Sequence, residues 1–489
     1  MNKVVYELFH RNAVENPGKL AFVDKSLELD WQHAFKLVVI ISREIKKKIK
    51  ETNPSKSCNM IVVKGDGSVL HVLLNFAIIL GRLVYIPHNR TLDRNKDHQF
   101  NKFPHVEVSK NSIFYLNETW TFERLENIEW VEQKTFDTHE VPAAFYYTSG
   151  TTGVPKVIVN SDTNILRGAK FVSEALHLKK SDVIAGTLLL DFDYGVNQIF
   201  CALYLGATYI AAPFSSTDIH WLKMVYKYRP TIIPAMPFLI ENYFTQGEKS
   251  SFDFVRMCTS SGAPFTKEHA NKVAGLFPKA TIVPMYGLSE GFRATIMPPG
   301  EYESRPSSVG KSIGDTQIRI VKNGFEECAL MEVGEIIQSS GCTSWGYFED
   351  LTSTEEKFVR DPDFPNRLWI KSGDLGYLDE ENFLYISGRV ESQIKLFGIR
   401  ISIDEIESRY KQIPGILNAV VIPISANETE SNFGVAVVSK LTLDEVKKST
   451  FGLPKEYRTR NIQIVPEILG NYNGGKPDRK LIYERYFRD

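Results

Sequence analysis

One run of the chain combines residue types that bind phosphate groups. Residues 146–156 read Tyr-Tyr-Thr-Ser-Gly-Thr-Thr-Gly-Val-Pro-Lys, with apolar residues on either side at 141–147 and 157–159. This pattern predicts a strand, a loop and a second strand. Glycines let the backbone approach an anion closely, while backbone amides and hydroxyl groups donate hydrogen bonds to phosphate oxygens. Lys156 adds a positive charge at the end of the loop.

The run therefore predicts a loop that holds a triphosphate, but not the P-loop of the common NTPases. A P-loop needs a lysine followed by serine or threonine at the start of a helix. Here Lys156 is followed by Val157, Ile158 and Val159. The β-branched residues among them favour a strand. The alternative is an ordinary surface loop rich in turn-forming residues.

Length and composition predict a large globular chain with no overall attraction to nucleic acid. The 489 residues are 43% hydrophobic and carry a formal net charge of -1. The length predicts two to four structural units, and a nearly neutral chain is not drawn to nucleic acid or to an acidic membrane. The five cysteines show no CxxC pair and no zinc-like spacing, which fits the reducing cytoplasm. The start of the chain does not resemble a signal peptide, and no apolar stretch of about 18 residues predicts a membrane span.

Alternating strand and helix patterns predict parallel sheets covered by helices. The first 50 residues read mostly as helices around a strand at 21–23, and the polar segment 90–140 has no clear pattern. Short strands separated by turns predict a β-rich unit from about residue 300, and a small α+β unit from about residue 391. Periodicity predicts further helices at 69–80, before 205 and at 402–410, and strands at 60–63, 83–87, 183–189, 208–212, 231–233, 255–258, 281–283, 309–320, 334–339, 368–370, 419–424 and 434–439.

Five motifs occur in one order along nearly the whole chain. They are the loop at 146–156, Tyr286-Gly287-Leu288-Ser289-Glu290, Lys371-Ser372-Gly373-Asp374-Leu375-Gly376-Tyr377, Gly388-Arg389 and Asn473-Gly474-Gly475-Lys476. Together they resemble the motifs of the ANL superfamily of adenylate-forming enzymes, which comprises acyl-CoA synthetases, adenylation domains of nonribosomal peptide synthetases and luciferases. The resemblance implies an α/β fold. A large N-terminal domain, residues 1–390, would hold two layered α/β subdomains and a β-rich subdomain, and a small mobile α+β domain would span residues 391–489, with Glu391 at the hinge.

The resemblance also implies a reaction, the joining of a carboxylate to the α-phosphate of ATP with Mg²⁺ present. Both partners are anionic, so the site has to neutralise charge and fix geometry. Lys156 and Lys476 take catalytic roles, with Lys476 bridging the carboxylate and the α-phosphate, and Glu290 holds Mg²⁺. The implied ATP- and AMP-binding residues are Thr148, Ser149, Gly150, Thr151, Thr152, Gly153, Ser261, Gly262, Ala263, Tyr286, Gly287, Ser289, Asp374 and Arg389.

Two of these nucleotide contacts have a specific chemical reason. Tyr286 would pack on adenine, and the two oxygens of Asp374 suit the paired hydroxyls of ribose. A buried tyrosine of the core and a turn-forming aspartate are the structural alternatives. For Glu290 and Lys476 the alternatives are a plain glutamate and a solvated charge.

The chain departs from the family pattern at several positions. Val157 follows the loop lysine where glycine is usual, and 160–162 reads Asn-Ser-Asp where the family often has Ser/Thr-His. Pro284 stands where peptide synthetases often have an asparagine that contacts adenine. Glu391 stands where the hinge is usually aspartate or lysine.

The acid-binding pocket is predicted from the segment that begins with Phe192-Asp193. In amino-acid-activating members of the family such an aspartate pairs with the substrate α-ammonium, which assigns that role to Asp193. The alternative is a helix N-cap, because apolar residues follow at helical spacing. Arg293 would pair with a second substrate carboxylate, pair with Asp193, or face solvent. The remaining residues expected to line the pocket are Tyr194, Asn197, Pro234, Cys258, Ser260, Met285 and Ala294.

The sequence therefore predicts an AMP-forming acid–thiol ligase that uses ATP and Mg²⁺. The first interpretation is a stand-alone enzyme that activates a small acid, an amino acid in particular, for the phosphopantetheine thiol of a separate acyl or peptidyl carrier protein, since no room for a carrier domain follows Lys476. The alternative is an acyl-CoA synthetase for a small organic acid. A third hypothesis is a catalytically silent relative that only binds a nucleotide.

Overall fold

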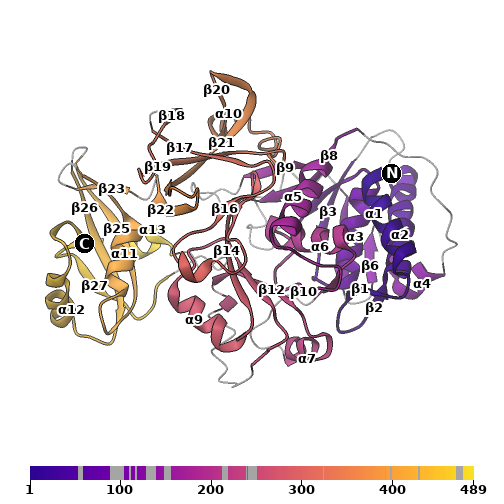
Figure 1. The fold of residues 1–489 in the computed structure, drawn as a ribbon, viewed down its shortest axis with the longest axis horizontal. Helices are drawn as coiled ribbons and strands as arrows, with labels where there is room; N and C mark the ends of the chain where they lie inside the picture. Colours follow the sequence, from indigo (N-terminus) through magenta and orange to yellow (C-terminus); the bar gives the residue numbers. More distant parts are fainter. Residues whose placement is uncertain are drawn as a thin grey trace. The chain divides into compact units, whose positions relative to one another are not determined.

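The computed structural model of the protein describes residues 1–52, 59–88, 104–109, 112–115, 118–127, 139–147, 156–211, 219–237, 239–240, 251–322, 324–390, 393–396, 399–427, 430–469 and 477–488. These residues divide into two units, one of 1–318 with 337–371 and one of 319–336 with 372–489. Figure 1 colours the elements of both units by their place in the chain. The expected boundary between residues 390 and 391 stays a prediction. In the described ranges, no helix combines the length and the apolarity needed to cross a bilayer.

The first unit contains a sheet of nine described strands in the order β16-β15-β14-β13-β12-β10-β11-β1-β2. The strands from β14 to β1 pair in parallel, which confirms the predicted buried parallel sheet. The chain leaves β10 earlier than predicted, at Gly186, which packs on Tyr209. The strands are β1 (Leu20–Val23), β2 (Glu28–Asp30), β10 (Val183–Ala185), β11 (Thr208–Ile210), β12 (Ile232–Ala235), β13 (Met257–Ser260), β14 (Thr281–Leu288), β15 (Phe292–Ile296) and β16 (Lys311–Ser312).

A second sheet of the first unit has seven described strands in the order β7-β6-β5-β3-β4-β8-β9. The two strands predicted on either side of the phosphate loop are confirmed, because β8 and β9 pair antiparallel with Tyr147 opposite Val157, and the loop residues 148–155 lie outside the described residues. The unassigned segment 90–140 supplies three edge strands and the short helix α4 (Phe122–Glu126). The strands are β3 (Met60–Lys64), β4 (Val84–Pro87), β5 (His105–Ser109), β6 (Ser112–Tyr115), β7 (Glu118–Thr121), β8 (Pro142–Tyr147) and β9 (Val157–Ser161).

Helices lie between the two sheets and on the outer face of the larger one (Figure 1). Helix α5 (Asp162–Ala175) contacts β8 and β9 of one sheet, β15 of the other, and α6 (Asp193–Leu205). The helices α1 (Lys3–Glu15), α2 (Trp31–Thr52) and α3 (Val69–Leu80) pack on one another. On the outer face, α7 (Ile219–Tyr228) and α9 (Lys267–Leu276) share an apolar cluster with β12 and β13.

The predicted β-rich part is present as a sheet in the order β18-β17-β19-β21-β20, with β22 paired to β21. Its strand β19 has the predicted bounds. The elements are η2 (Tyr302–Ser304), β17 (Gln317–Lys322), β18 (Glu326–Glu327), β19 (Gly334–Ser339), α10 (Leu351–Lys357), β20 (Phe358–Asp361), β21 (Phe364–Leu378) and β22 (Leu384–Arg389).

The C-terminal residues form the predicted α+β arrangement. Alternate residues of the edge strand β25 (Ile416–Asn427) face two apolar clusters, with Ala419 and Val421 in one and Val420 and Ile422 in the other, as the two-residue period of a strand requires. The elements are β23 (Gln393–Leu396), β24 (Ile399–Ser402), α11 (Ile403–Lys411), β25 (Ile416–Asn427), β26 (Glu430–Ser439), α12 (Leu443–Ser449), η3 (Thr450–Gly452), η4 (Lys455–Tyr457), β27 (Ile462–Ile464) and α13 (Arg479–Tyr486).

The hairpin of β14 and β15 is closed by an unusually tight turn. A Cβ at Gly287 would lie 2.1 Å from the backbone oxygen of Phe292 and 2.8 Å from the Arg293 Cα. Phe292 has a left-handed φ of 55°, a conformation that costs free energy for a bulky residue. It is held there by burial, since its side chain is 1% exposed and a Cβ at Gly168 would lie only 3.2 Å from its ring. The turn therefore depends on glycine at 287 and on the buried ring at 292.

We expect Gly287→Ala to lower the free energy of unfolding by about 1–3 kcal/mol, because the added methyl group overlaps backbone atoms that cannot move independently. The matched control is Gly275→Ala in α9, where a Cβ meets no atom within 4 Å. That variant should be neutral or more stable by about 0.5–1 kcal/mol. Urea unfolding followed by circular dichroism measures both, and equal stability of the two variants would contradict the account of the turn.

Candidate functional site

Glu290 lies in the turn between β14 and β15 and is 7% exposed. Its Oε1 accepts a hydrogen bond from the Tyr347 hydroxyl at 2.6 Å, and its backbone oxygen accepts one from the Ser344 amide at 2.8 Å. Burial, and then the charge of Glu290, raise the pKa of Tyr347, so this hydroxyl remains a protonated donor. The Lys156 Nζ lies 5.1 Å from the centroid of the Tyr347 ring. The structure thus brings Lys156 and Glu290, predicted from separate motifs, to the same tyrosine.

Tyr347 was missed by the sequence analysis. The glycine before it, Gly346, is the feature of the sequence that could have pointed to this turn. Gly346 has a left-handed φ of 108°, a conformation that favours glycine. The segment is fixed on both sides of Tyr347, since Trp345 and Phe348 donate backbone hydrogen bonds to Val159 and Val157 of β9. The tyrosine is therefore held next to the strand that follows the predicted phosphate loop.

The surroundings of Glu290 fit a magnesium ion that is held mainly by substrate phosphates. In the described part of the chain, no three His, Cys, Asp or Glu side chains group as a metal site. Mg²⁺ commonly uses one or two carboxylates together with phosphate oxygens. The second carboxylate oxygen of Glu290 accepts no hydrogen bond from a described residue. A single buried carboxylate with a free oxygen is the arrangement that such an ion needs.

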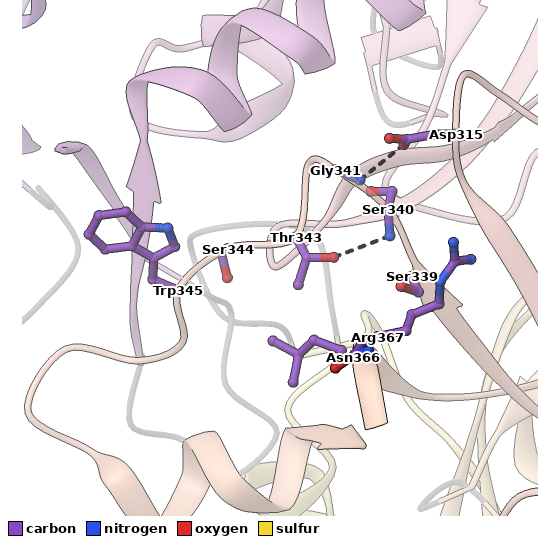
Figure 2. A pocket seen from close by; sticks show the side chains of 10 residues that line it. Asp315, Ser339, Ser340, Gly341, Thr343, Ser344, Trp345, Asn366 and Arg367 are labelled. Carbon is purple, nitrogen blue, oxygen red and sulfur yellow. Dashed lines mark hydrogen bonds between the residues drawn. The ribbon is translucent and has the colours of Figure 1, made fainter. Parts of the chain in front are cut away.

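A cavity of about 530 Å³ lies beside the same segment (Figure 2). Its lining includes Ser344, whose amide contacts Glu290, and Arg367. The Ser344 Oγ and the Arg367 Nη1 are buried and have no hydrogen-bond partner among the described residues. Figure 2 shows Trp345 turned away from the other lining residues, and the Gly341 amide donating to Asp315. The cavity offers polar atoms to a ligand without interrupting the Glu290 contacts.

The predicted acid pocket contains a buried ion pair. The Arg293 Nη2 donates to the Asp193 Oδ2 at 2.6 Å, with side chains 6% and 10% exposed respectively. The Ser289 hydroxyl donates to the other oxygen, Oδ1, at 3.1 Å, and the Arg293 Nη1 donates to the Ser261 hydroxyl at 3.3 Å. The guanidinium also lies 4.8 Å from the centroid of the Tyr194 ring. Of the three possibilities for Arg293, the structure therefore has the pair with Asp193.

The helix-cap alternative for Asp193 does not describe the structure. The N-cap residue of α6 is Phe192, which makes no side-chain cap, and Asp193 is the first helical residue. Its carboxylate faces Arg293 and Ser289, residues of the β14–β15 hairpin, instead of the helix amides. Removing one member of such a buried pair leaves the other charge without compensation, at a cost of about 3–5 kcal/mol.

The other predicted pocket residues lie on α6 and on strands of the larger sheet. Tyr194 and Asn197 lie on α6 with Asp193, and the Tyr194 hydroxyl bonds the Thr259 hydroxyl at 2.8 Å. Cys258 instead belongs to the apolar cluster with α7 and α9, where burial raises its pKa to about 12. Because successive strand residues face opposite sides, Thr259 and Ser261 face the ion pair and Cys258 does not. Pro234, Ser260, Met285 and Ala294 are buried in β12, β13, β14 and β15.

Several predicted nucleotide contacts of the first unit lie on the same hairpin or in the turn that follows β13. Tyr286 is half-buried opposite Thr295 on β15, and Gly287 and Ser289 follow it. Gly262 has a left-handed φ of 89°, in the turn that continues from Ser261 to Ala263 after β13. These contacts with a nucleotide stay predictions.

In the second unit, the two predicted ribose contacts lie side by side. Asp374 on β21 pairs with Arg389 on β22, and the Arg389 Nε lies 3.1 Å from the Asp374 Oδ1. The Asp374 amide is held by the Ser372 hydroxyl at 2.9 Å. The sequence placed these residues in separate motifs, and antiparallel pairing joins them. Thr148, Ser149, Gly150, Thr151, Thr152, Gly153, Glu391 and Lys476 lie outside the described residues.

Comparison with known proteins gives related sequences of two kinds. The chain is 25% identical over 346 residues to 4-coumarate-CoA ligase 1 of Narcissus pseudonarcissus, covering 67% of this chain and 62% of that protein. It is 26% identical over 349 residues to a plipastatin synthase polypeptide of Bacillus subtilis (strain 168), covering 70% of this chain and 14% of that protein. The matched region therefore spans about three fifths of the plant relative.

Solved structures share the fold over nearly the whole chain. The o-succinylbenzoate CoA synthetase MenE from Bacillus subtilis, in complex with its acyl-adenylate intermediate, matches with a TM-score of 0.81 and 18% identity, covering 97% of both chains. ATP-bound MatB from Rhodopseudomonas palustris matches with a TM-score of 0.83 and 17% identity, covering 100% of both. At this identity the likeness concerns the fold, a large N-terminal domain with a small C-terminal domain.

The family assignment rests on the sequence. The profile of the AMP-binding enzyme family matches residues 82–348, more than half of the 489 residues. This range contains the predicted phosphate loop, the Glu290 turn and Tyr347. The chain belongs to the AMP-binding enzyme family, within the superfamily of adenylate-forming enzymes.

Proposed function

We propose that this chain is an AMP-forming ligase that activates a small carboxylic acid and transfers the acyl group to the thiol of coenzyme A. The observation that carries the proposal is the meeting of Lys156 and Glu290 at Tyr347. A mobile cation and a buried carboxylate with a free oxygen, next to the predicted phosphate loop, are what an ATP-dependent attack by a carboxylate needs.

The proposed reaction has two steps. In the first, a carboxylate oxygen of the acid attacks the α-phosphorus of ATP, and the bond to the β-phosphate breaks with release of pyrophosphate. In the second, the sulfur of the thiol attacks the carbonyl carbon of the acyl adenylate, the thiol proton is lost, and AMP leaves. The first step brings two anions together, so positive charge has to be placed between them.

The residues of this chain take the following roles. Lys156 stabilises the leaving pyrophosphate, and Glu290 orients the magnesium ion, which neutralises phosphate charge when bound. Tyr347 holds the Glu290 carboxylate in place by its hydroxyl. Asp374 binds the ribose hydroxyls with Arg389 beside it, Tyr286 packs on adenine, and Lys476 bridges the carboxylate and the α-phosphate.

One observation supports coenzyme A as the acceptor, and another supports an acid other than an amino acid as the substrate. One relative is a 4-coumarate-CoA ligase, and its alignment covers 67% of this chain and 62% of that protein. In addition, the carboxylate that would receive an amino-acid ammonium, that of Asp193, is already paired with Arg293. Amino-acid activation for a carrier protein remains the second candidate, because the Phe192-Asp193 segment resembles that of amino-acid-activating members and a plipastatin synthase polypeptide is also a relative.

We expect Glu290→Gln to lower the rate of acid-dependent exchange of pyrophosphate into ATP by roughly 10²–10³-fold, because the amide cannot supply the negative charge that holds Mg²⁺. Glu268→Gln is the matched control, since Glu268 is an exposed residue of α9 and its loss should leave exchange unchanged. Raising the Mg²⁺ concentration should partly restore the Glu290 variant. An equal rate in both variants would contradict the role of Glu290.

Lys476→Ala separates the two half-reactions. Loss of its charge at the developing anionic centre should slow adenylate formation by about 10²-fold or more, while thioester formation from supplied acyl adenylate and coenzyme A should continue. Pyrophosphate exchange measures adenylate formation. The release of AMP and the loss of free thiol measure thioester formation. Similar losses in both steps would show that Lys476 is not specific to the first.

The acceptor is tested with the wild-type protein. Acid, ATP and Mg²⁺ with coenzyme A should give a thioester and AMP in equal amounts. The same mixture with a phosphopantetheinylated carrier protein should give far less. Preferential loading of the carrier, or exchange driven by amino acids and not by other acids, would favour the second candidate.

A further inference from the structure

Both oxygens of the Asp193 carboxylate already accept a hydrogen bond. Its Oδ2 accepts from Arg293 at 2.6 Å and its Oδ1 accepts from Ser289 at 3.1 Å. An ammonium group at Asp193 would share this carboxylate with a guanidinium that is itself buried and already cancels its charge. With Arg293 in place, the approaching ammonium would also meet a like charge, which disfavours binding.

Arg293 is held in position from three sides, and one of its three nitrogen atoms has no partner among the described residues. Asp193 and Ser261 accept from its two terminal nitrogens, and the Tyr194 ring lies against its guanidinium. Its Nε is buried and meets no acceptor in the part of the chain that the structure describes. Buried donors in proteins nearly always have a partner, so the Nε is a position for a ligand acceptor.

Two other polar groups of this interior are also buried and have no partner among the described residues. The Tyr146 hydroxyl on β8 is one, and burial, with a smaller effect of the Asp193 charge, raises the pKa of Tyr146. The Asn197 Nδ2, one helical turn after Asp193, is the other, and neither bonds to a described residue. The interior around the pair is therefore polar while its fixed charges cancel.

We propose that the Asp193–Arg293 pair sets the charge selectivity of the acid pocket. While the pair is intact the pocket is electrically neutral. It then takes an acid whose remaining part carries no net charge and presents a hydrogen-bond acceptor, such as a hydroxyl or carbonyl oxygen, to the Arg293 Nε. This inference rests on the proposed ligase function and specifies its substrate class.

Single substitutions of the pair should change the preferred charge in opposite directions. Arg293→Met leaves Asp193 without a cation, so kcat/KM for an α-amino acid relative to its deaminated analogue should rise roughly tenfold or more. Asp193→Asn leaves Arg293 without an anion, so kcat/KM for a dicarboxylic acid relative to the monocarboxylic acid of equal length should rise by a similar factor. The double variant has no net charge again and should return to the wild-type preference.

The matched control is the pair of Arg82 and Asp162, with side chains 11% and 7% exposed and a separation of 3.2 Å. Arg82→Met also leaves a buried carboxylate without its guanidinium, but it should change no substrate preference. Thermal unfolding of each variant identifies a loss of fold. If a single variant does not fold, the charge preference is measured on the wild type and the double variant instead. Calorimetry then compares their binding of unreactive acyl-adenylate analogues with neutral, cationic and anionic acyl groups.

The outcomes separate this inference from the function on which it rests. A wild-type protein without acid-dependent pyrophosphate exchange for any acid would overturn the ligase function. A wild-type protein that prefers uncharged acids, with both single variants shifted in the expected directions, supports the inference. An active wild type that prefers amino acids, or single variants whose preferences do not shift, would overturn the inference and leave the ligase function standing.

Discussion

The turn that closes β14 and β15 is the constraint on which the candidate site depends. Gly287 lets the two strands approach closely, and Phe292 adopts a left-handed conformation because its buried ring is held next to α5. Ser289 and Glu290 precede Phe292 in the chain and Arg293 follows it. The fixed turn therefore positions all three side chains. One short hairpin therefore supplies the residue that faces Tyr347 and the residue that pairs with α6.

The candidate site contains two buried carboxylates, Glu290 and Asp193, and their partners differ in charge. Glu290 is bonded to a neutral tyrosine through one oxygen, and its other oxygen accepts no hydrogen bond from a described residue, so the carboxylate keeps its charge for a cation that arrives with the substrate. Asp193 is fully compensated by Arg293 and Ser289, so its charge is not available to such a cation. The difference follows from the partner, because a protonated hydroxyl leaves the negative charge in place while a guanidinium cancels it. Burial makes both arrangements sensitive to the loss of a single group.

Strand pairing in the second unit joins two residues that the motifs kept apart. Asp374 and Arg389 belong to different motifs but lie directly opposite each other on β21 and β22. The Ser372 hydroxyl and the Glu335 carboxylate fix the turn before Asp374 by accepting hydrogen bonds from backbone amides. The carboxylate is thereby presented on a rigid strand, which suits the recognition of a ligand with two fixed hydroxyl groups.

The sequence by itself determined the fold class, the two strands that flank the predicted phosphate loop, helix 69–80 and the order of the motifs. These depend on local apolar periods and on residue types that a phosphate loop needs. Segment 90–140 gave no signal because its edge strands are short, and Tyr347 was missed because its role comes from contact with Glu290. Only the tertiary structure decided that Asp193 is paired with Arg293 and that Cys258 lies in an apolar cluster. Pairing between residues 100 positions apart, and the face that a strand residue takes, are set by packing, which no local pattern encodes.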